Sequence, residues 1–188
     1  MMLIRKLHLH ERPLFVEHLR RLPPNDRQFR FAHAHVTDEA IARYVGRIDH
    51  DDLILGCLAE DRLVGGAHVA FTGEVAEVGL SVDPDHRAQG IGAELFRRAS
   101  HWARNRRAQK LYTLCQTDNR AMLALAAKLG MVVHRESGTA EAFLALDPPD
   151  LLTVSDELSV GVHNVINEWT DLMRTCGGVL LAPPRSGR

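Results

Sequence analysis

The chain has 188 residues, of which 45% are hydrophobic and 25% are charged, and its formal net charge is -1. This length and composition predict one globular domain with a small appendage, and the balanced charge argues against nucleic acid or an anionic membrane as the partner. The three cysteines, Cys57, Cys115 and Cys176, are too far apart to indicate a disulfide framework or a cysteine metal site. The sequence contains neither a signal-peptide pattern nor a membrane-helix pattern, so we expect a cytoplasmic protein. It contains no HExxH pattern either, so we expect no bound metal.

The first 50 residues predict one strand and two helices. Residues 4–8 alternate apolar and polar side chains, as a strand does. Residues 14–22 carry apolar side chains at helical spacing and are expected to end at Pro23-Pro24. A second helix is expected from Thr37, as its N-cap, to about residue 48. The polar and aromatic stretch between these helices, residues 25–36, is interpreted as a connector.

The next 30 residues predict an antiparallel meander. Three short apolar runs, at residues 53–59, 63–71 and 75–82, are separated by turn-forming residues. Gly65-Gly66 indicates a bulge in the second of these strands. The remaining elements are a helix at residues 92–107, a strand at 111–115, a helix at 119–129 and a closing hairpin at 132–134 and 142–146. A meander combined with a crossover predicts a mixed sheet and the α+β class.

The run Asp147-Pro148-Pro149-Asp150 is a plausible domain boundary. It divides the chain into a domain at residues 1–148 and an extension at residues 149–188. Apolar residues between Leu158 and Met173 have helical spacing, so we expect a C-terminal helix. Its apolar stripe must be buried on the domain or in a homodimer.

A glycine-bearing turn separates the strand at residues 75–82 from the long helix, and its sequence is Arg87-Ala88-Gln89-Gly90-Ile91-Gly92. The first turn of a helix has unpaired N–H groups and partial positive charge, so it favours a phosphate. The two glycines allow close approach of the backbone, and Arg87 adds charge. On this pattern alone, a purely structural turn and a site for another nucleotide stay open. A Rossmann site is disfavoured because Leu95 stands where its third glycine belongs.

The spacing Arg87-x-x-Gly90-x-Gly92, after a strand that ends in Val82-Asp83-Pro84, resembles the acetyl-CoA motif of the GNAT acetyltransferases. A second stretch, from Asn119 to Lys128-Leu129-Gly130-Met131, is similar to the helix that follows in that family. The resemblance implies a mostly antiparallel mixed sheet with two splayed central strands, flanked by helices, over residues 4–146. It also implies an enzyme that transfers the acetyl group of acetyl-CoA to a primary amine.

The resemblance also implies which residues hold acetyl-CoA. The strand backbone would bind the pantetheine arm and stabilise the oxyanion, the turn would hold the diphosphate, and the next helix would add one contact. In that order, the residues are Leu80 and Val82, then Arg87, Ala88, Gln89, Gly90, Ile91 and Gly92, and finally Asn119.

Glu77 is the predicted general base. A lysine-like amine has a pKa of about 10.4, so its deprotonation at pH 7 costs roughly 4–5 kcal/mol, and a nearby carboxylate offsets part of this cost. Strand alternation puts Glu77 on one face with the small residues Gly79 and Ser81, which leaves room for an acceptor. The family resemblance implies the same role. The alternative is a solvated carboxylate paired with an arginine.

The departing thiolate lacks the acid that would protonate it, because the family often has a tyrosine where this chain has Ala126. Tyr112, Cys115 and Ser81 are substitute candidates. The missing tyrosine motivates an alternative function, a non-catalytic module that binds acyl-CoA as a sensor. The run from Leu22 to Phe31 is similar to bacterial protein-lysine acetyltransferases. The acceptor is thus left open between a small-molecule amine and a protein lysine.

Overall fold

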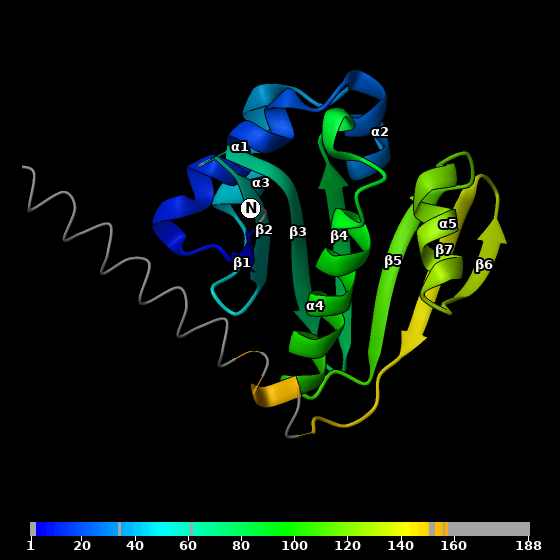
Figure 1. The fold of residues 1–188 in the computed structure, drawn as a ribbon. Helices are drawn as coiled ribbons and strands as arrows, with labels where there is room; N and C mark the ends of the chain where they lie inside the picture. The colour runs from blue at the N-terminus through cyan, green and yellow to red at the C-terminus, as the bar shows by residue number, and fades with distance from the viewer. Residues whose placement is uncertain (1–2, 34, 61, 151–152, 156, 158–188) are drawn as a thin grey trace, which may run out of the picture.

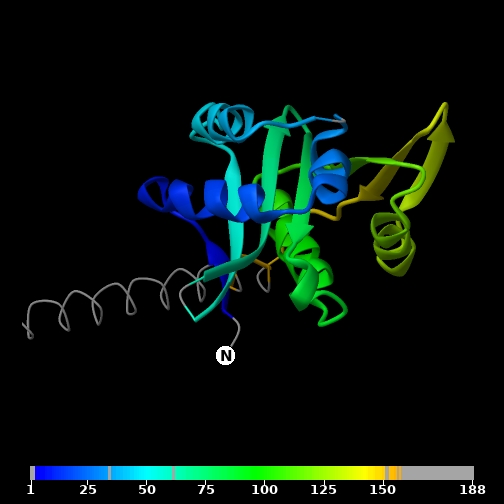
Figure 2. The same cartoon turned by 90° about the horizontal axis from the view of Figure 1, so that it is seen from above.

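The computed structural model describes residues 3–33, 35–60, 62–150, 153–155 and 157. Within these ranges the chain forms one seven-stranded sheet in the order β1-β2-β3-β4-β5-β7-β6, with helices on both faces (Figures 1 and 2). All neighbouring strands are antiparallel except β4 and β5, which are parallel. The predicted α+β class and mostly antiparallel mixed sheet are therefore confirmed.

The elements follow the predicted order with one addition, a helix between the first two predicted helices. The strands are β1 (Leu3–Lys6), β2 (Leu53–Ala59), β3 (Arg62–Thr72), β4 (Val75–Val82), β5 (Lys110–Gln116), β6 (Val132–Glu136) and β7 (Thr139–Ala145). The helices are α1 (Arg12–Arg21), α2 (Pro24–Phe31), α3 (Asp38–Gly46), α4 (Ile91–Asn105) and α5 (Arg120–Lys128).

The added helix α2 corrects the interpretation of residues 25–36 as a connector. Pro23-Pro24 does end α1, but Pro24 is also the first residue of α2. Proline suits the first turn of a helix because that turn has no intrahelical partner for its N–H. Asp26 adds a favourable negative charge in the same turn. Helix α2 ends where Ala32 takes a left-handed conformation with φ of 54°.

The predicted bulge in β3 lies one residue earlier than expected. Cys57 pairs with Gly65 and Leu58 pairs with Leu63, so Val64 is the extra residue. Gly65 and Gly66 themselves pair regularly with both neighbouring strands.

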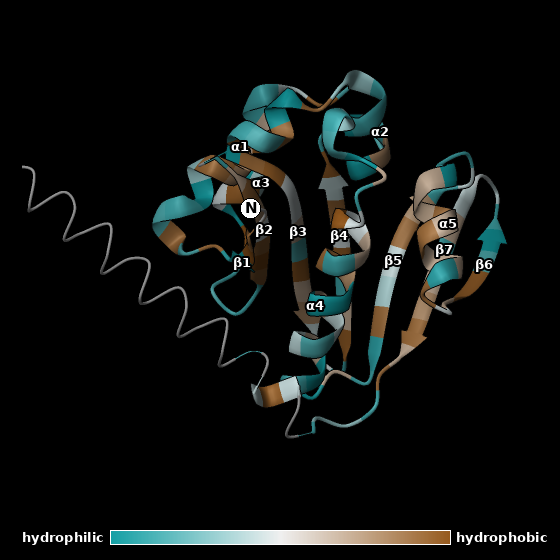
Figure 3. Cartoon of the chain, viewed as in Figure 1, coloured by the Kyte–Doolittle hydropathy of each residue, from teal (hydrophilic) through white to brown (hydrophobic). Residues whose placement is uncertain are grey.

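Two hydrophobic cores fill the two faces of the sheet. The larger core lies between the strands and α4, with Leu95, Phe96 and Trp102 at its centre. The smaller core joins α1 and α3 to the opposite face through Phe15 and Ile41. Figure 3 shows mainly apolar residues along the central strands and mainly polar residues on the visible faces of α1 and α4, whereas α5 is mainly apolar. The sheet therefore separates one helical layer from the other.

The chain after β7 returns to the C-terminal end of α4. Arg104 donates to the carbonyl oxygens of Asp147 and Pro148 at 2.9 and 2.8 Å, and Asn105 donates to that of Thr153 at 3.0 Å. The helix predicted between Leu158 and Met173 lies outside the described residues. No helix in the described ranges combines the length and apolar character needed to cross a bilayer.

Candidate active site

The two central strands separate halfway along their length. Strands β4 and β5 pair only over three residues, and their last pair is Glu77 with Tyr112. Beyond this pair, β4 continues to Val82 and β5 to Gln116 without pairing to each other, and the two strands diverge in Figure 1. The splayed strands expected from the resemblance are therefore present, and Glu77 lies at the vertex of the splay.

The open edge of β4 presents backbone groups toward β5. Asp83 N donates to the carbonyl oxygen of Val64 at 2.8 Å, so the backbone of Asp83 faces β3. At the other end of the strand, the carbonyl oxygen of Glu74 accepts from Gln109 N at 2.8 Å, so Glu74 faces β5.

Successive residues of a strand point their N–H and C=O groups to alternate sides. The directions observed at Asp83 and at Glu74 therefore predict the same orientation for the residues between them. The N–H and C=O groups of Leu80 and Val82 point into the gap between β4 and β5. An extended ligand that carries amides can pair with such an edge.

A cavity of about 600 Å³ occupies this gap. Residues from both faces of the sheet line it, which means that it passes between the two strands. At one end lie the start of α4 and the N-terminal part of α5, and at the other lie Phe29 and Arg30 of α2. The cavity thus joins the predicted phosphate turn to the face of the sheet that α1, α2 and α3 cover.

The start of α4 supplies unpaired donors at one end of the cavity. Glu94 N closes the first helical turn by donating to the carbonyl oxygen of Gly90 at 3.0 Å. The structure records no protein acceptor, anywhere in the described ranges, for the N–H groups of Ile91, Gly92 and Ala93. Gly90 has a φ of 82°, a left-handed conformation that glycine adopts without strain. These amides and the helix dipole form an anion site.

Arg87 beside this turn already has an anionic partner. Its Nη2 donates to Asp26 of α2 at 2.5 Å, and its Nε donates to the carbonyl oxygen of Val82 at 3.3 Å. About half of the Arg87 side chain is exposed. Ala88 and Gln89 complete the turn, and Ala88 lines the cavity with Gly90. A phosphate at the turn would therefore compete with Asp26 for Arg87.

Asn119 opens α5 as its N-cap. Its side-chain carbonyl accepts from Met122 N at 3.1 Å, which satisfies one of the free amides of the helix. Asn119 also lines the cavity. Its carbonyl is used by the helix, so its NH₂ group is the part that a ligand would meet.

Glu77 is exposed, and it shares a face of the sheet with Gly79 and Ser81. It does not line the 600 Å³ cavity itself, but it stands at the closed end of the gap beside Tyr112. Burial, together with the charges of Glu141 and Glu77 and a 3.3 Å hydrogen bond to Glu141, raises the pKa of Tyr112 to about 12. These carboxylates make this part of the face acidic, which favours the approach of a cationic amine.

The substitute acids for the missing tyrosine differ in position. Ala126 is buried in the larger core, and its methyl side chain has no acidic proton to donate. Tyr112 does not line the cavity, and its hydroxyl donates to Glu141. Cys115 and Ser81 do line it. Burial raises the pKa of the Cys115 thiol, which disfavours its thiolate.

Ser81 belongs to a constellation that the sequence did not predict. Its Oγ lies 2.9 Å from Nε2 of His18, a buried residue of α1. The His18 Nδ1 lies 3.0 Å from Asp83 Oδ1, although the two atoms are poorly aligned for a hydrogen bond. Arg62 and Arg21 also contact Asp83, and with His18 they outweigh the effect of burial and lower the pKa of this carboxyl. The constellation anchors α1 to the end of β4.

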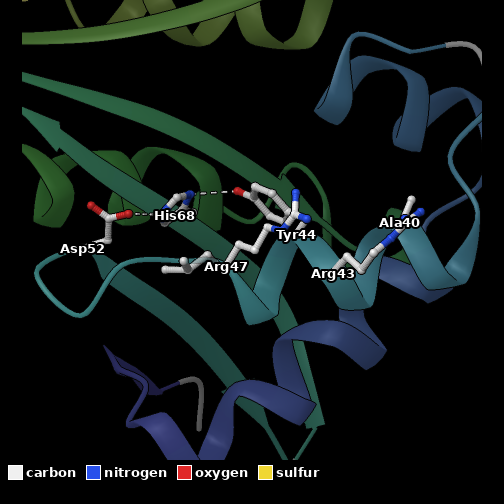
Figure 4. Close-up of a pocket in the computed structure, with 7 residues that line it drawn as sticks. Ala40, Arg43, Tyr44, Arg47, Asp52 and His68 are labelled. Atoms are coloured by element: carbon white, nitrogen blue, oxygen red, sulfur yellow. Dashed lines mark hydrogen bonds and ion pairs between the residues drawn. The ribbon is translucent and has the colours of Figure 1, made fainter.

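Helix α2 contributes the other group that was missed, Arg30. Its Nη2 donates to the Tyr44 hydroxyl at 2.7 Å. Tyr44 and His68 also line a second, smaller hollow of about 420 Å³ between α3 and the sheet, drawn in Figure 4. The advance signals were the aromatic and basic run Phe29-Arg30-Phe31 and the similarity of residues 22–31 to protein-lysine acetyltransferases, and neither assigned a role to Arg30. Among the described residues, no group of three or more His, Cys, Asp or Glu side chains is arranged to hold a metal ion.

Solved structures of acetyltransferases share this fold. The GNAT domain of S. lividans PAT is 17% identical with a TM-score of 0.66, over 76% of this chain and 89% of that one. The paia N-acetyltransferase from Thermoplasma acidophilum, solved with coenzyme A, is 17% identical with a TM-score of 0.62, over 77% and 99%. The spermidine N-acetyltransferase from Vibrio cholerae, solved with CoA and spermine, is 15% identical with a TM-score of 0.61, over 77% and 95%.

At these identities, the structural likeness shows a common fold and nothing finer. No curated protein matches the sequence significantly. The sequence model of the Acetyltransferase (GNAT) family, however, matches residues 13–131. This match covers more than half of the chain and includes β4, the glycine turn, α4 and α5. The chain therefore belongs to the GNAT acetyltransferase family.

Proposed function

We propose that this protein transfers the acetyl group of acetyl-CoA to a primary amine by direct attack of the amine on the thioester. One observation carries the proposal: a cavity runs from the unpaired amides of Ile91, Gly92 and Ala93 along the open edge of β4, and Glu77 stands at the vertex of the splay where the gap closes. A diphosphate suits the first end, and an amide-bearing arm suits the open strand edge.

The residues of the turn would hold the diphosphate. The N–H groups at the start of α4 supply donors and the positive end of the helix dipole. Gly90 and Gly92 line the cavity and leave the backbone of the turn without side chains, so a phosphate can approach it closely. Arg87 would add a charge-assisted contact after leaving Asp26. Asn119 would donate its amide from the opposite side.

The residues of β4 would carry the chemistry. Acetyl-CoA supplies an activated acetyl group: the acceptor nitrogen bonds to the acetyl carbon, and the carbon–sulfur bond breaks with its electron pair going to sulfur. Glu77 accepts the proton that the nitrogen loses. The N–H of Leu80, which faces the gap, donates to the acetyl oxygen as that oxygen gains negative charge.

No dedicated acid is required for the departing sulfur. A thiol has a pKa of about 8.5, so sulfur leaves as a thiolate at modest cost or takes a proton from water. Ser81 and Cys115 are the substitute candidates that line the cavity. Because a buried alanine stands at position 126 in place of the tyrosine acid, the second candidate function is a module that binds acyl-CoA without turnover.

Thiol release from acetyl-CoA tests this function directly. The purified protein should release coenzyme A faster when amines are added, over a panel of small amines and lysine peptides. Binding of coenzyme A without thiol release from any amine would support the sensor and contradict the enzyme. Preferential stabilisation by NAD or ATP in a thermal-shift assay would contradict the assignment of acetyl-CoA.

Three finer assignments belong to the same proposal. The similarity of residues 22–31 to bacterial protein-lysine acetyltransferases supports a protein lysine as one acceptor class. The buried free thiols Cys57 and Cys115 support a reducing compartment such as the cytoplasm. We also propose that residues 1–148 form the catalytic domain and that residues 149–188 form an extension, whose predicted helix would bury its apolar stripe on this domain or in a homodimer.

A further inference from the structure

The acceptor side of the cavity holds an arginine directly over Gly79. A Cβ built on Gly79 would lie 2.6 Å from both Cζ and Nη1 of Arg30, so the guanidinium occupies the space that a side chain would take. Arg30 comes from the C-terminal part of α2 and lines the cavity beside Phe29. Gly79 is adjacent to Leu80, whose backbone faces the gap. A cation therefore lies next to the predicted site of reaction.

A chain of hydrogen bonds fixes this guanidinium in place. Arg30 Nη2 donates to the Tyr44 hydroxyl at 2.7 Å, and this hydroxyl lies 2.7 Å from Nδ1 of His68. Nε2 of His68 lies 2.9 Å from Asp52 Oδ2, and the other oxygen of Asp52 accepts from Phe71 N at 3.1 Å. Figure 4 shows the part of the chain from Asp52 through His68 to Tyr44.

The direction of each hydrogen bond in this chain follows from its ends. Arginine only donates, so the Tyr44 oxygen accepts from Arg30 and its own proton goes to Nδ1 of His68. His68 then carries its proton on Nε2 and donates it to Asp52. This arrangement needs a neutral imidazole, and burial, reinforced by the charge of Arg30, lowers the pKa of His68. The chain thus orients Arg30 without neutralising it.

Arg30 keeps donors that no protein group uses. Its Nε is buried and has no hydrogen-bond partner, and no described carboxylate forms an ion pair with its guanidinium. Two nearby arginines behave differently, since Arg27 pairs with Asp38 at 2.9 Å and Arg87 pairs with Asp26. The rings of Phe31 and Tyr44 lie 5.3 and 5.4 Å from the guanidinium carbon and complete its surroundings. An anion is the partner that this site lacks.

The same face of β4 has the opposite charge two residues away. Glu77 and Gly79 share this face, and two residues along a strand span about 7 Å. Tyr112, beside Glu77, donates to Glu141, which adds a second carboxylate at this pole. The face therefore presents a negative pole at Glu77 and a positive pole at Arg30, with the small Gly79 backbone between them.

We propose that the acceptor is a primary amine with a carboxylate a few atoms away, that Arg30 binds this carboxylate, and that the amine is thereby directed toward Glu77. The proposal rests on the acetyl transfer proposed above. A free amino acid and a lysine beside an acidic residue in a peptide both present this chemistry. Arg30 is a substrate-binding residue in this account, and Tyr44 positions it.

Matched acceptors test the proposal. Thiol release is measured for β-alanine and β-alaninamide, and for a lysine peptide whose neighbouring residue is either glutamate or glutamine. The ratio of kcat/KM for the acid over that for its amide is then compared between the wild-type protein and Arg30→Gln. We expect Arg30→Gln to lower this ratio by about 10- to 100-fold, as the loss of charge-assisted hydrogen bonds predicts. The pair with the larger decrease identifies the source of the carboxylate.

Two further variants separate recognition from structure. Arg135→Gln removes the same charge from an exposed residue of β6, which lines neither the cavity nor the hollow of Figure 4, and should keep the wild-type ratio. Tyr44→Phe removes only the hydroxyl that orients Arg30 and should lower the ratio by less than Arg30→Gln does. Equal ratios in wild type and a folded Arg30→Gln variant would overturn the proposal.

A binding measurement keeps the inference distinguishable from the proposed function. The complex with coenzyme A is titrated with N-acetyl-β-alanine and with its amide, and stabilisation is followed by thermal shift. We expect the acid to stabilise the wild-type protein more than the amide does, and Arg30→Gln to abolish this difference. If no amine releases thiol, acetyl transfer fails, and this titration still decides the anion site. Equal stabilisation by acid and amide would overturn it.

Discussion

The two ends of the cavity present charge by different means. At the α4 end, the positive field comes from backbone amides and the helix dipole, and Arg87 of the turn is paired with Asp26. At the α2 end, the charge comes from side chains, with Arg30 over Gly79 and Glu77 at the vertex of the splay. The first end depends on a glycine turn of six residues, and the second brings together residues of α2, α3, β3 and β4.

This difference determines how readily amino-acid substitutions alter the binding site at each end. A backbone site is altered only by substitutions that shift the main chain, so it suits a ligand that stays the same, such as a diphosphate. A side-chain site is altered by single substitutions, so it suits an acceptor that differs between related enzymes. Substitutions at the two ends should therefore affect different kinetic quantities.

The largest expected effect is at Glu77. Glu77→Gln removes the proposed base and keeps the shape of the side chain, so kcat should decrease by roughly 10²- to 10⁴-fold while affinity for coenzyme A stays within about twofold. Steady-state kinetics and calorimetric titration measure the two quantities. Glu136→Gln, at an exposed carboxylate of β6, should change neither. Unchanged turnover in Glu77→Gln would remove this residue from the mechanism.

The glycine turn should respond in the opposite way. Gly90 and Gly73 both have positive φ, 82° and 58°, and neither has an atom within 4 Å of a built Cβ. Replacing either by alanine should cost about 1–2 kcal/mol of folding free energy through backbone strain. Only Gly90→Ala should also weaken coenzyme A binding, by about tenfold, because it distorts the amides of α4. Equal affinities of the two variants for coenzyme A would show that the turn does not bind the ligand.

The ion pair between Arg87 and Asp26 should have a smaller effect on the affinity for coenzyme A. If a phosphate competes with Asp26 for Arg87, then Asp26→Asn should strengthen coenzyme A binding by up to about fivefold, the range of an exposed ion pair. Arg87→Gln should weaken binding instead. Titrations at two salt concentrations measure both, since salt screens the pair. Weaker binding in Asp26→Asn would show that the aspartate supports the site rather than competing for Arg87.

The smallest expected effect is the pH dependence that comes from His68. Its pKa in the folded protein lies below the ordinary value of about 6.5, so the unfolded chain binds the extra proton first as pH decreases. The free energy of unfolding should therefore decrease as pH falls below about 6.5 toward the folded pKa. Chemical denaturation over this range should give a shallower dependence for His68→Gln than for wild type. An equal or steeper dependence would contradict the neutral imidazole in the chain.

The contrast between the two ends also explains what the sequence revealed. The phosphate turn is local, so the strand end, the glycines and the helix start stood side by side in residues 82–92. The splay followed from the same motif through the family resemblance. Helix α2 was missed because Pro23-Pro24 is compatible with both the end of α1 and the start of α2.

The acceptor end could not be predicted because no local pattern contains it. Arg30, Tyr44, His68 and Asp52 are brought together only by tertiary packing of α2 and α3 against the sheet. The contact of Ser81 with His18 likewise joins β4 to a helix 63 residues earlier in the sequence. The partners of these side chains are visible only in three dimensions.

A crystal structure of the complex with coenzyme A tests the central claim most directly. The account predicts diphosphate oxygens about 2.7–3.2 Å from the backbone nitrogens of Ile91, Gly92 and Ala93, with the pantetheine arm along Leu80 and Val82. A diphosphate bound elsewhere, with these three amides unpaired or facing water, would contradict it.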